Sequence, residues 1–147
     1  MPFTFSVVYR TEAPLADPDV AVDLETALST RSLRMGETTH LTATVHNNTT
    51  TGQPMTIARI GIPGGLSAQQ WQLDALKEQK LIDFYETRPR EVAVYWRGLP
   101  PSATMNIGLD LVATVPGTYT GPASSAYLYY TDDRKDWSDG VRVEIAR

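Results

Sequence analysis

The sequence predicts a mainly β fold: an antiparallel β-sandwich of about nine strands with one inserted α-helix at about residues 67–80. Two observations carry this prediction. Short runs of alternating apolar and polar residues recur along the chain, and turn-forming residues separate them roughly every ten residues, as in sandwich domains. One segment departs from this alternation and spaces its apolar residues at the helical period instead.

The strand predictions rest on the period-two alternation. In residues 38–45 the apolar side chains alternate with polar ones, so His40 and His46 are expected on the face opposite the core. The expected strands are residues 3–9, 20–25, 38–45, 55–62, 81–86, 91–97, 105–115, 124–131 and 140–145.

The end of the chain predicts a β-hairpin. Its two arms are expected at residues 124–131 and 140–145, and an acidic segment that carries Trp137 lies between them. This segment is rich in Asp and Ser, which favour turns because their side chains bond to nearby backbone groups.

The predicted helix begins with a capping signal. Ser67 is a preferred N-cap residue, and Gln70 three positions later completes a capping box. Trp71, Leu73 and Leu76 form an apolar stripe that we expect to be buried against a sheet. If the ring of Trp71 is buried, its replacement by Ala should cost about 3–5 kcal/mol.

Composition excludes several classes of function. The 147 residues fit a single domain spanning 1–147, and a net charge of −4 leaves no basic excess for nucleic acid. Because the chain has no Cys, a disulfide framework, thiol catalysis and Cys-based zinc sites are excluded. No apolar run approaches the roughly 18 residues that insertion into a membrane requires, and the first residues do not resemble a signal peptide.

Several segments, taken in order, resemble the C-terminal, receptor-binding-type domain of the α2-macroglobulin family in its bacterial form. The resemblance covers nearly the whole chain. The segments that carry it are Met35-Gly36-Glu37 before an alternating strand, Gly61-Ile62-Pro63-Gly64-Gly65 before the helix, Val92-Ala93-Val94-Tyr95-Trp96, Val115-Pro116-Gly117 and the Tyr-rich residues 126–131.

The resemblance implies a non-catalytic role. Family members are large secreted or periplasmic protease inhibitors, in which cleavage of a bait region closes the molecule round the protease and a Cys–Gln thioester can bond to it. With no Cys, this chain holds no thioester. The resemblance therefore implies a domain that packs against other domains of its parent chain and mediates interaction after trapping, outside the cytoplasm.

Receptor binding is not carried over from the resemblance. In vertebrate members two lysines on the helix engage a receptor, and the corresponding positions here fall near Gln70 and Asp74. Lys77 and Lys80 are the candidates for a protein contact through the helix face. Their alternative reading is a solvated helix end, where cations are favoured by the helix dipole.

Other residue groups give no strong site, and we expect no catalytic residues, cofactor or metal. Six residues of strand separate His40 and His46 by roughly 20 Å, and the Asp residues of 132–139 lack the spacing of a calcium loop. The tyrosines are expected in packing rather than in a sugar platform. The alternative function is a carbohydrate-binding or adhesion module of a surface protein, and a glycosidase domain in the parent gene would favour it.

Overall fold

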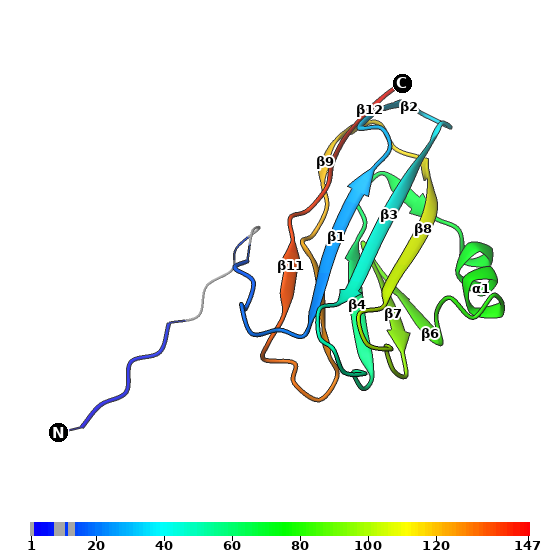
Figure 1. Cartoon of the computed structure of the whole chain (residues 1–147). Helices are drawn as coiled ribbons and strands as arrows, with labels where there is room; N and C mark the ends of the chain where they lie inside the picture. The colour runs from blue at the N-terminus through cyan, green and yellow to red at the C-terminus, as the bar shows by residue number, and fades with distance from the viewer. Residues whose placement is uncertain (1, 8–10, 12–13) are drawn as a thin grey trace.

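The computed structural model describes residues 2–7, 11 and 14–147, and within them twelve strands and one helix confirm the predicted sandwich (Figure 1). The four-stranded sheet has the order β1 (Val22–Leu28), β3 (Thr38–Asn47), β8 (Thr104–Ala113) and β5 (Leu66–Ala68). The five-stranded sheet has the order β11 (Asp136–Ser138), β10 (Ser124–Leu128), β4 (Thr56–Gly61), β7 (Glu91–Trp96) and β6 (Phe84–Arg88). A three-stranded sheet joins β2 (Ser32–Arg34), β12 (Arg142–Ala146) and β9 (Gly117–Thr120).

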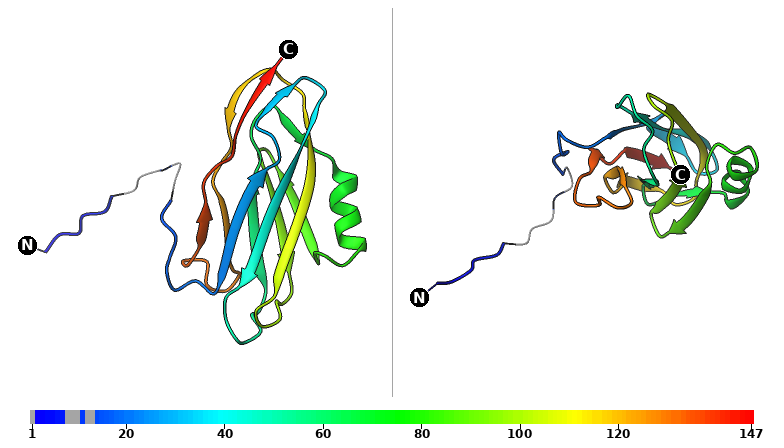
Figure 2. Two further views of the ribbon diagram at one scale, coloured as in Figure 1. Left: turned by 45° about the horizontal axis from the view of Figure 1, so that its top comes forward. Right: turned by 60° about the horizontal axis from the view of Figure 1, so that its bottom comes forward.

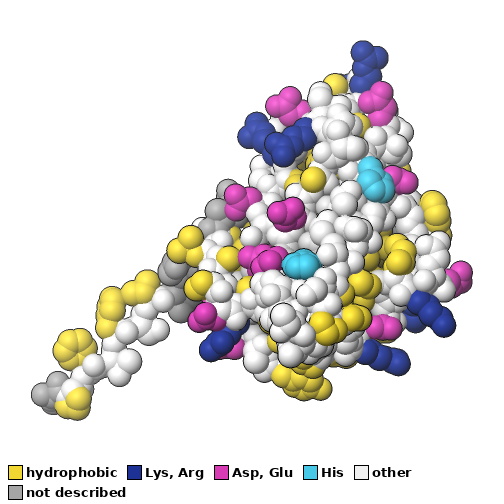
Figure 3. All heavy atoms as spheres, viewed as in Figure 1, with side chains coloured by type: hydrophobic (Ala, Val, Ile, Leu, Met, Phe, Trp, Pro, Cys, Tyr) yellow, Lys and Arg dark blue, Asp and Glu magenta, His cyan; other side chains and the backbone are white. Residues whose placement is uncertain are grey.

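The core lies between the four-stranded and five-stranded sheets. On β3 the side chains of Leu41, Ala43 and Val45 are at most 1% exposed, as their alternation predicts. His40 and His46 lie on the opposite face of β3 and hydrogen-bond to neighbouring β8 residues through their Nδ1 atoms. Figure 3 shows this outer face, where few side chains are hydrophobic or charged and the two histidines lie apart.

The helix starts later than its capping signal predicts. Ser67 lies inside β5 and pairs with Val112 of β8, so its backbone is extended and it caps nothing. The helix α1 (Gln70–Glu78) follows Gln69, whose side chain makes no cap hydrogen bond. The N-cap position is therefore two residues later than predicted. Trp71 is 67% exposed, so the large loss expected for a buried ring does not apply.

The C-terminal end of α1 uses Lys80 as a backbone element. Lys80 adopts a left-handed conformation with φ 60°. Its N–H donates to the carbonyl of Lys77, and the N–H of Leu81 donates to that of Leu76. This is the Schellman arrangement, in which glycine usually occupies the left-handed position.

Gln72 continues the ladder of β5 with its side chain. Its Nε2 donates to the carbonyl of Asp110 at 2.9 Å, and its Oε1 accepts the Asp110 N–H at 2.7 Å. Asp110 is adjacent to residues 111–113 of β8, which are the residues that pair with β5. The sequence pattern gives Gln72 no such role, because a polar residue on a helix is normally assigned to solvent.

We expect Gln72→Leu to cost about 1–3 kcal/mol, because two backbone groups of β8 lose their partner. Gln72→Glu retains the acceptor but turns a carboxylate oxygen toward the carbonyl of Asp110 and buries a charge, so at neutral pH it should cost at least as much as Gln72→Leu. Urea unfolding of the three proteins measures the order. Equal stability of all three would show that water replaces the amide at no cost.

The terminal hairpin exists, but its turn was misplaced. Residues 136–138, predicted as turn, form β11 and pair with β10, while β12 pairs with β9 in the same register. The two arms change sheets together at Gly121 and Gly140, where a Cβ on Gly140 would lie 1.9 Å from the carbonyl oxygen of Gly121. The turn instead falls between β10 and β11, so the pairing of 124–131 with 140–145 is wrong.

The short strands and the N-terminal strand also differ from the prediction. β2, β5, β9 and β11 have three or four residues each, too few for alternation to reveal them. Of the strand expected at 3–9, residues 3–7 are extended but belong to none of the strands, and 8–9 lie outside the described residues.

Candidate docking surface

A row of large side chains crosses the outer face of the five-stranded sheet, away from the core. Direct strand partners place Phe84 of β6 beside Tyr95 of β7, Tyr95 beside Ile57 of β4, and Ile57 beside Tyr127 of β10. Phe84 and Tyr95 have ring centroids 5.8 Å apart. The Nζ of Lys135 lies 4.7 Å from the centroid of Tyr127, so a cation closes one end of the row.

One end of this row opens into a surface hollow of about 540 Å³. Phe84 and Tyr129 are each 51% exposed at its edge. A backbone hydrogen bond joins two of its lining residues, since the N–H of Tyr129 donates to the carbonyl of Met55. The lining residues are Met55, Lys77, Asp83, Phe84, Glu86, Arg88, Tyr95, Arg97 and Tyr129.

The charges around the hollow leave a cationic excess. Three cations and two carboxylates line it, and both carboxylates have partners. Asp83 accepts the backbone N–H of Arg97, and Glu86 pairs with Arg88 at 3.3 Å. Protein interfaces are enriched in methionine, aromatic residues and arginine, and the hollow has one Met, three aromatic rings and two Arg, so it is suited to contact with another protein surface.

An ion pair lies on the neighbouring part of this face. Arg59 donates to Glu91 through Nε at 2.8 Å and through a terminal nitrogen at 3.2 Å. This hydrogen-bonded pair outweighs the opposing effect of burial and raises the pKa of Arg59 above its ordinary value. Burial, aided by the charge of Glu86, raises the pKa of Tyr95, so this phenol remains neutral where it lines the hollow.

The two lysines predicted as a contact site are not equivalent. Lys77 lines the hollow, and its Nζ lies 5.6 Å from the ring centroid of Phe84. Lys80 is exposed but does not line the hollow; its backbone terminates α1. Asp74 accepts a hydrogen bond from the hydroxyl of Tyr85, which raises the pKa of that phenol.

The tyrosines and Trp96 do not form one platform. Trp96 is in the core at 2% exposure, and Tyr119 hydrogen-bonds to Pro116 on another sheet. Tyr95, Tyr127 and Tyr129 do share the outer face. Phe84 and Met55 were missed, because alternation alone does not reveal which residues of neighbouring strands become partners.

Asp136 and Ser138, which were predicted to lie in a turn, hold β11 against β1. The Oδ2 of Asp136 accepts the N–H of Leu24 at 2.6 Å, and Ser138 shares a hydrogen bond with Thr26. These contacts connect β11 to β1 across the side of the sandwich. Among the residues that the structure describes, no group of three or more His, Asp or Glu side chains could hold a metal ion.

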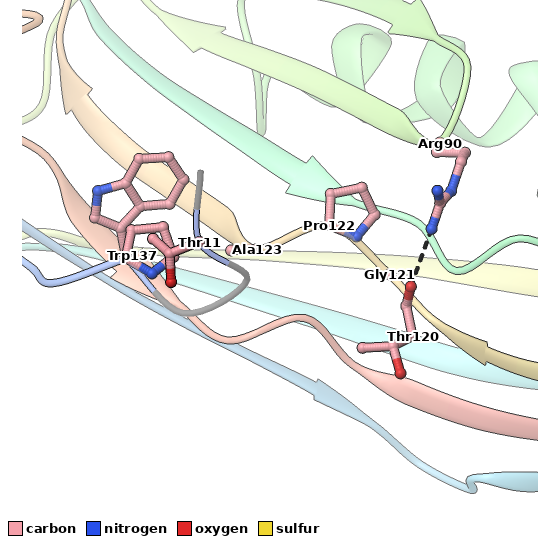
Figure 4. Close-up of a pocket in the computed structure, with 8 residues that line it drawn as sticks. Thr11, Arg90, Thr120, Gly121, Pro122, Ala123 and Trp137 are labelled. Atoms are coloured by element: carbon pink, nitrogen blue, oxygen red, sulfur yellow. Dashed lines mark hydrogen bonds between the residues drawn. The ribbon is translucent and has the colours of Figure 1, made fainter. Parts of the chain in front are cut away.

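A second hollow, of about 390 Å³, lies where the terminal hairpin changes sheets (Figure 4). Arg90 reaches across one end of it and donates to the carbonyl of Thr120 at 2.9 Å, while Trp137 and Thr11 lie at the other end. Pro122 and Ala123 form the wall between these ends. This hollow is smaller than the one beside Lys77, and the guanidinium of Arg90 is already bonded within the chain.

Solved structures with the same fold come from bacterial α2-macroglobulins. A native Escherichia coli α2-macroglobulin fragment superposes with a TM-score of 0.72 at 15% identity, covering 91% of this chain and 25% of that one. Salmonella α2-macroglobulin reacted with methylamine gives 0.74 at 18% identity, covering 95% and 10%. The native E. coli protein seen by cryo-electron microscopy gives 0.76 at 16% identity, covering 95% and 10%.

This chain therefore spans between a tenth and a quarter of the length of these three structures. The nine-residue α1, the one helix of the described residues, is too short to cross a bilayer. No curated protein matches the sequence. The family described as the A-macroglobulin receptor binding domain matches residues 51–138, more than half of the chain, so the chain belongs to that family.

Proposed function

We propose that this chain is a non-catalytic domain of an α2-macroglobulin-like endopeptidase inhibitor, and that the hollow beside Lys77 docks against another domain of the same longer protein. The observation that carries the proposal is the exposed aromatic and cationic lining of that hollow. The comparisons support it, because the solved relatives are polypeptides several times longer than this chain.

The physical argument concerns the exposed rings. Phe84 and Tyr129 each leave about half of their side chain in water, and the hollow between them is concave. Covering such rings favours association by about 25 cal/mol for each Å² of apolar surface removed from water. Lys77 and Arg97 add a preference for a partner surface with acidic groups.

In this proposal the domain acts by contact with its parent chain. Trapping of a protease would be carried out by the whole inhibitor, outside the cytoplasm. This domain would contribute a docking surface, and its contacts with neighbouring domains would be kept or exchanged for others as the inhibitor closes. Residues 1–147 would provide no catalytic group to that process.

The test is binding of this chain to the parent protein from which it has been removed. Phe84→Ala and Tyr129→Ala should each weaken the calorimetric Kd by roughly tenfold or more, as expected for central aromatic contacts. Trp71→Ala removes an exposed ring outside the hollow and should change the Kd by no more than about twofold. Equal losses for all three variants would contradict the assignment of the hollow.

The two lysines provide a matched pair within the same experiment. Lys77→Glu places a negative charge at the hollow and should weaken docking, mostly at low ionic strength because salt screens the interaction. Lys80→Glu alters the charge at the end of α1 outside the hollow and should have little effect. An equal effect of both substitutions would favour a contact through the helix end.

The carbohydrate-binding alternative is not favoured. A sugar ring stacks on a flat platform, but Phe84 and Tyr95 are tilted by 57° and Tyr129 and Tyr130 by 84°. The match to the A-macroglobulin receptor-binding family also favours the first function.

A further inference from the structure

Residues 2–7 form an extended arm that lies apart from the sandwich. Figures 1 and 2 show it leading away from the side of the molecule that carries β1 and β11. A backbone contact that ties this region of the chain to the sandwich is the hydrogen bond from the N–H of Asp17 to the carbonyl of Lys135. Residues 2–7 take no part in the strand ladders of the described chain.

The sequence of the arm is typical of a strand with one buried face, but its apolar side chains are exposed. Phe3, Phe5 and Val7 alternate with Thr4 and Ser6, so the three apolar side chains share one face of an extended segment. Their exposures are 89%, 83% and 65%. Figure 3 shows these hydrophobic side chains as a separate group on the arm.

An alternating sequence whose apolar side chains are exposed suggests that the arm pairs with the edge of a sheet. A single strand is not stable in water, and an alternating apolar face becomes stable when its backbone pairs with an edge strand and its apolar side chains cover a core. The arm lies on the side of β1 and β11, where one backbone donor of β1 is already bonded, since the N–H of Leu24 donates to Asp136.

We propose that residues 3–7 form a β-strand on the edge of a sheet in another domain of the same longer protein. The inference rests on the proposal that this chain is one domain of an α2-macroglobulin-like protein. The solved relatives match up to 95% of this chain within one long polypeptide. A neighbouring domain is therefore present at high effective concentration, which favours it over a second copy of the chain.

Hydrogen exchange on the unmodified proteins tests the proposal. In the isolated chain the amides of residues 3–7 should exchange at the rate of an unstructured peptide, because no ladder protects them. In the longer protein the same amides should exchange at least about 100-fold more slowly. Exchange at the unstructured rate in both proteins would overturn the proposal.

Selective labelling of single thiols tests which face of the proposed strand is buried. The chain has no Cys, so Phe5→Cys and Thr4→Cys each introduce one thiol into it. In the isolated chain both thiols should react with iodoacetamide at similar rates, as measured by mass spectrometry of the N-terminal peptide. In the longer protein the Phe5→Cys thiol should react at least about tenfold more slowly than the Thr4→Cys thiol, and equal rates there would contradict a strand with one buried face.

Two results separate this proposal from its alternatives. If deleting residues 2–9 lowers the melting temperature of the isolated chain by several degrees, the arm belongs to this sandwich. If the isolated chain is a dimer that Phe5→Asp converts to a monomer, the partner is a second copy. Either result overturns the proposal. Neither result bears on the hollow beside Lys77, because that hollow is tested by substitutions at Lys77, Phe84 and Tyr129, which lie outside residues 2–9.

Discussion

Replacing Asn47 with Asp should destabilise the isolated domain by about 3 kcal/mol at neutral pH. The side chain of Asn47 is fully buried, and its Nδ2 donates to the carbonyls of Thr51 and Pro100, each at 2.9 Å. Its Oδ1 accepts the N–H and the hydroxyl of Thr49. An aspartate would turn an acceptor oxygen toward two carbonyl oxygens and would place a charge in the interior.

The loss of stability caused by Asn47→Asp should increase with pH. A buried carboxyl that faces carbonyl oxygens has a raised pKa, because the protonated form can donate a hydrogen bond and carries no charge. The penalty of Asn47→Asp should therefore be smallest below about pH 4, the ordinary pKa of Asp, and should grow as the pH rises above it. Urea unfolding at several pH values measures this trend.

Asn106→Asp is the matched control. Asn106 is exposed, and its Oδ1 accepts a hydrogen bond from the hydroxyl of Thr44, which an aspartate also accepts. We expect a change within about 0.5 kcal/mol for this surface position. Equal losses at the two sites would mean that the hydrogen bonds of Asn47 contribute little to the fold.

Gly61→Ala should also destabilise the fold strongly. A Cβ at Gly61 would lie 2.0 Å from the carbonyl oxygen of Pro122, at the point where the terminal hairpin changes sheets. Backbone atoms cannot move aside as the end of a side chain can, so we expect a loss of about 3 kcal/mol. For a domain of this size that corresponds to a melting temperature lower by roughly 6–12 °C.

Gly52→Ala controls for the general effect of adding a methyl group. A Cβ at Gly52 would have its nearest neighbour, the carbonyl oxygen of Leu99, at 3.5 Å, which is an ordinary contact. Calorimetry should find Gly52→Ala close to the parent chain. A small effect of Gly61→Ala would show that the hairpin break is more adaptable than its close approach indicates.

The sequence predicts those parts of the fold that local periodicity determines. The alternation of Leu41, Ala43 and Val45 identifies β3 and its buried face correctly. The helix start was wrong because a tertiary interaction decides it: Ser67 has the side chain of an N-cap, yet its backbone pairs with β8. The terminal turn was wrong for the same reason, since residues 136–138 pair with β10 despite their turn-forming composition.

The candidate site, too, could be predicted only in the part that local sequence determines. Lys77 could be selected from the sequence because a cation on a helix is exposed, and it lines the hollow. Its aromatic neighbours could not be selected, because Phe84, Tyr95 and Met55 come together through the order and register of β6, β7 and β4. That register depends on pairings between strands that are far apart in the sequence.

Oxidative footprinting is the most direct test of the proposed docking surface. Met55 and Tyr129 line the hollow, whereas Trp71 is exposed outside it, and all three side chains react with hydroxyl radicals. The account predicts that Met55 and Tyr129 are labelled readily in the isolated chain and are protected at least about fivefold in the longer protein, while Trp71 is labelled equally in both. Equal labelling of Met55 and Tyr129 in the two proteins would contradict it.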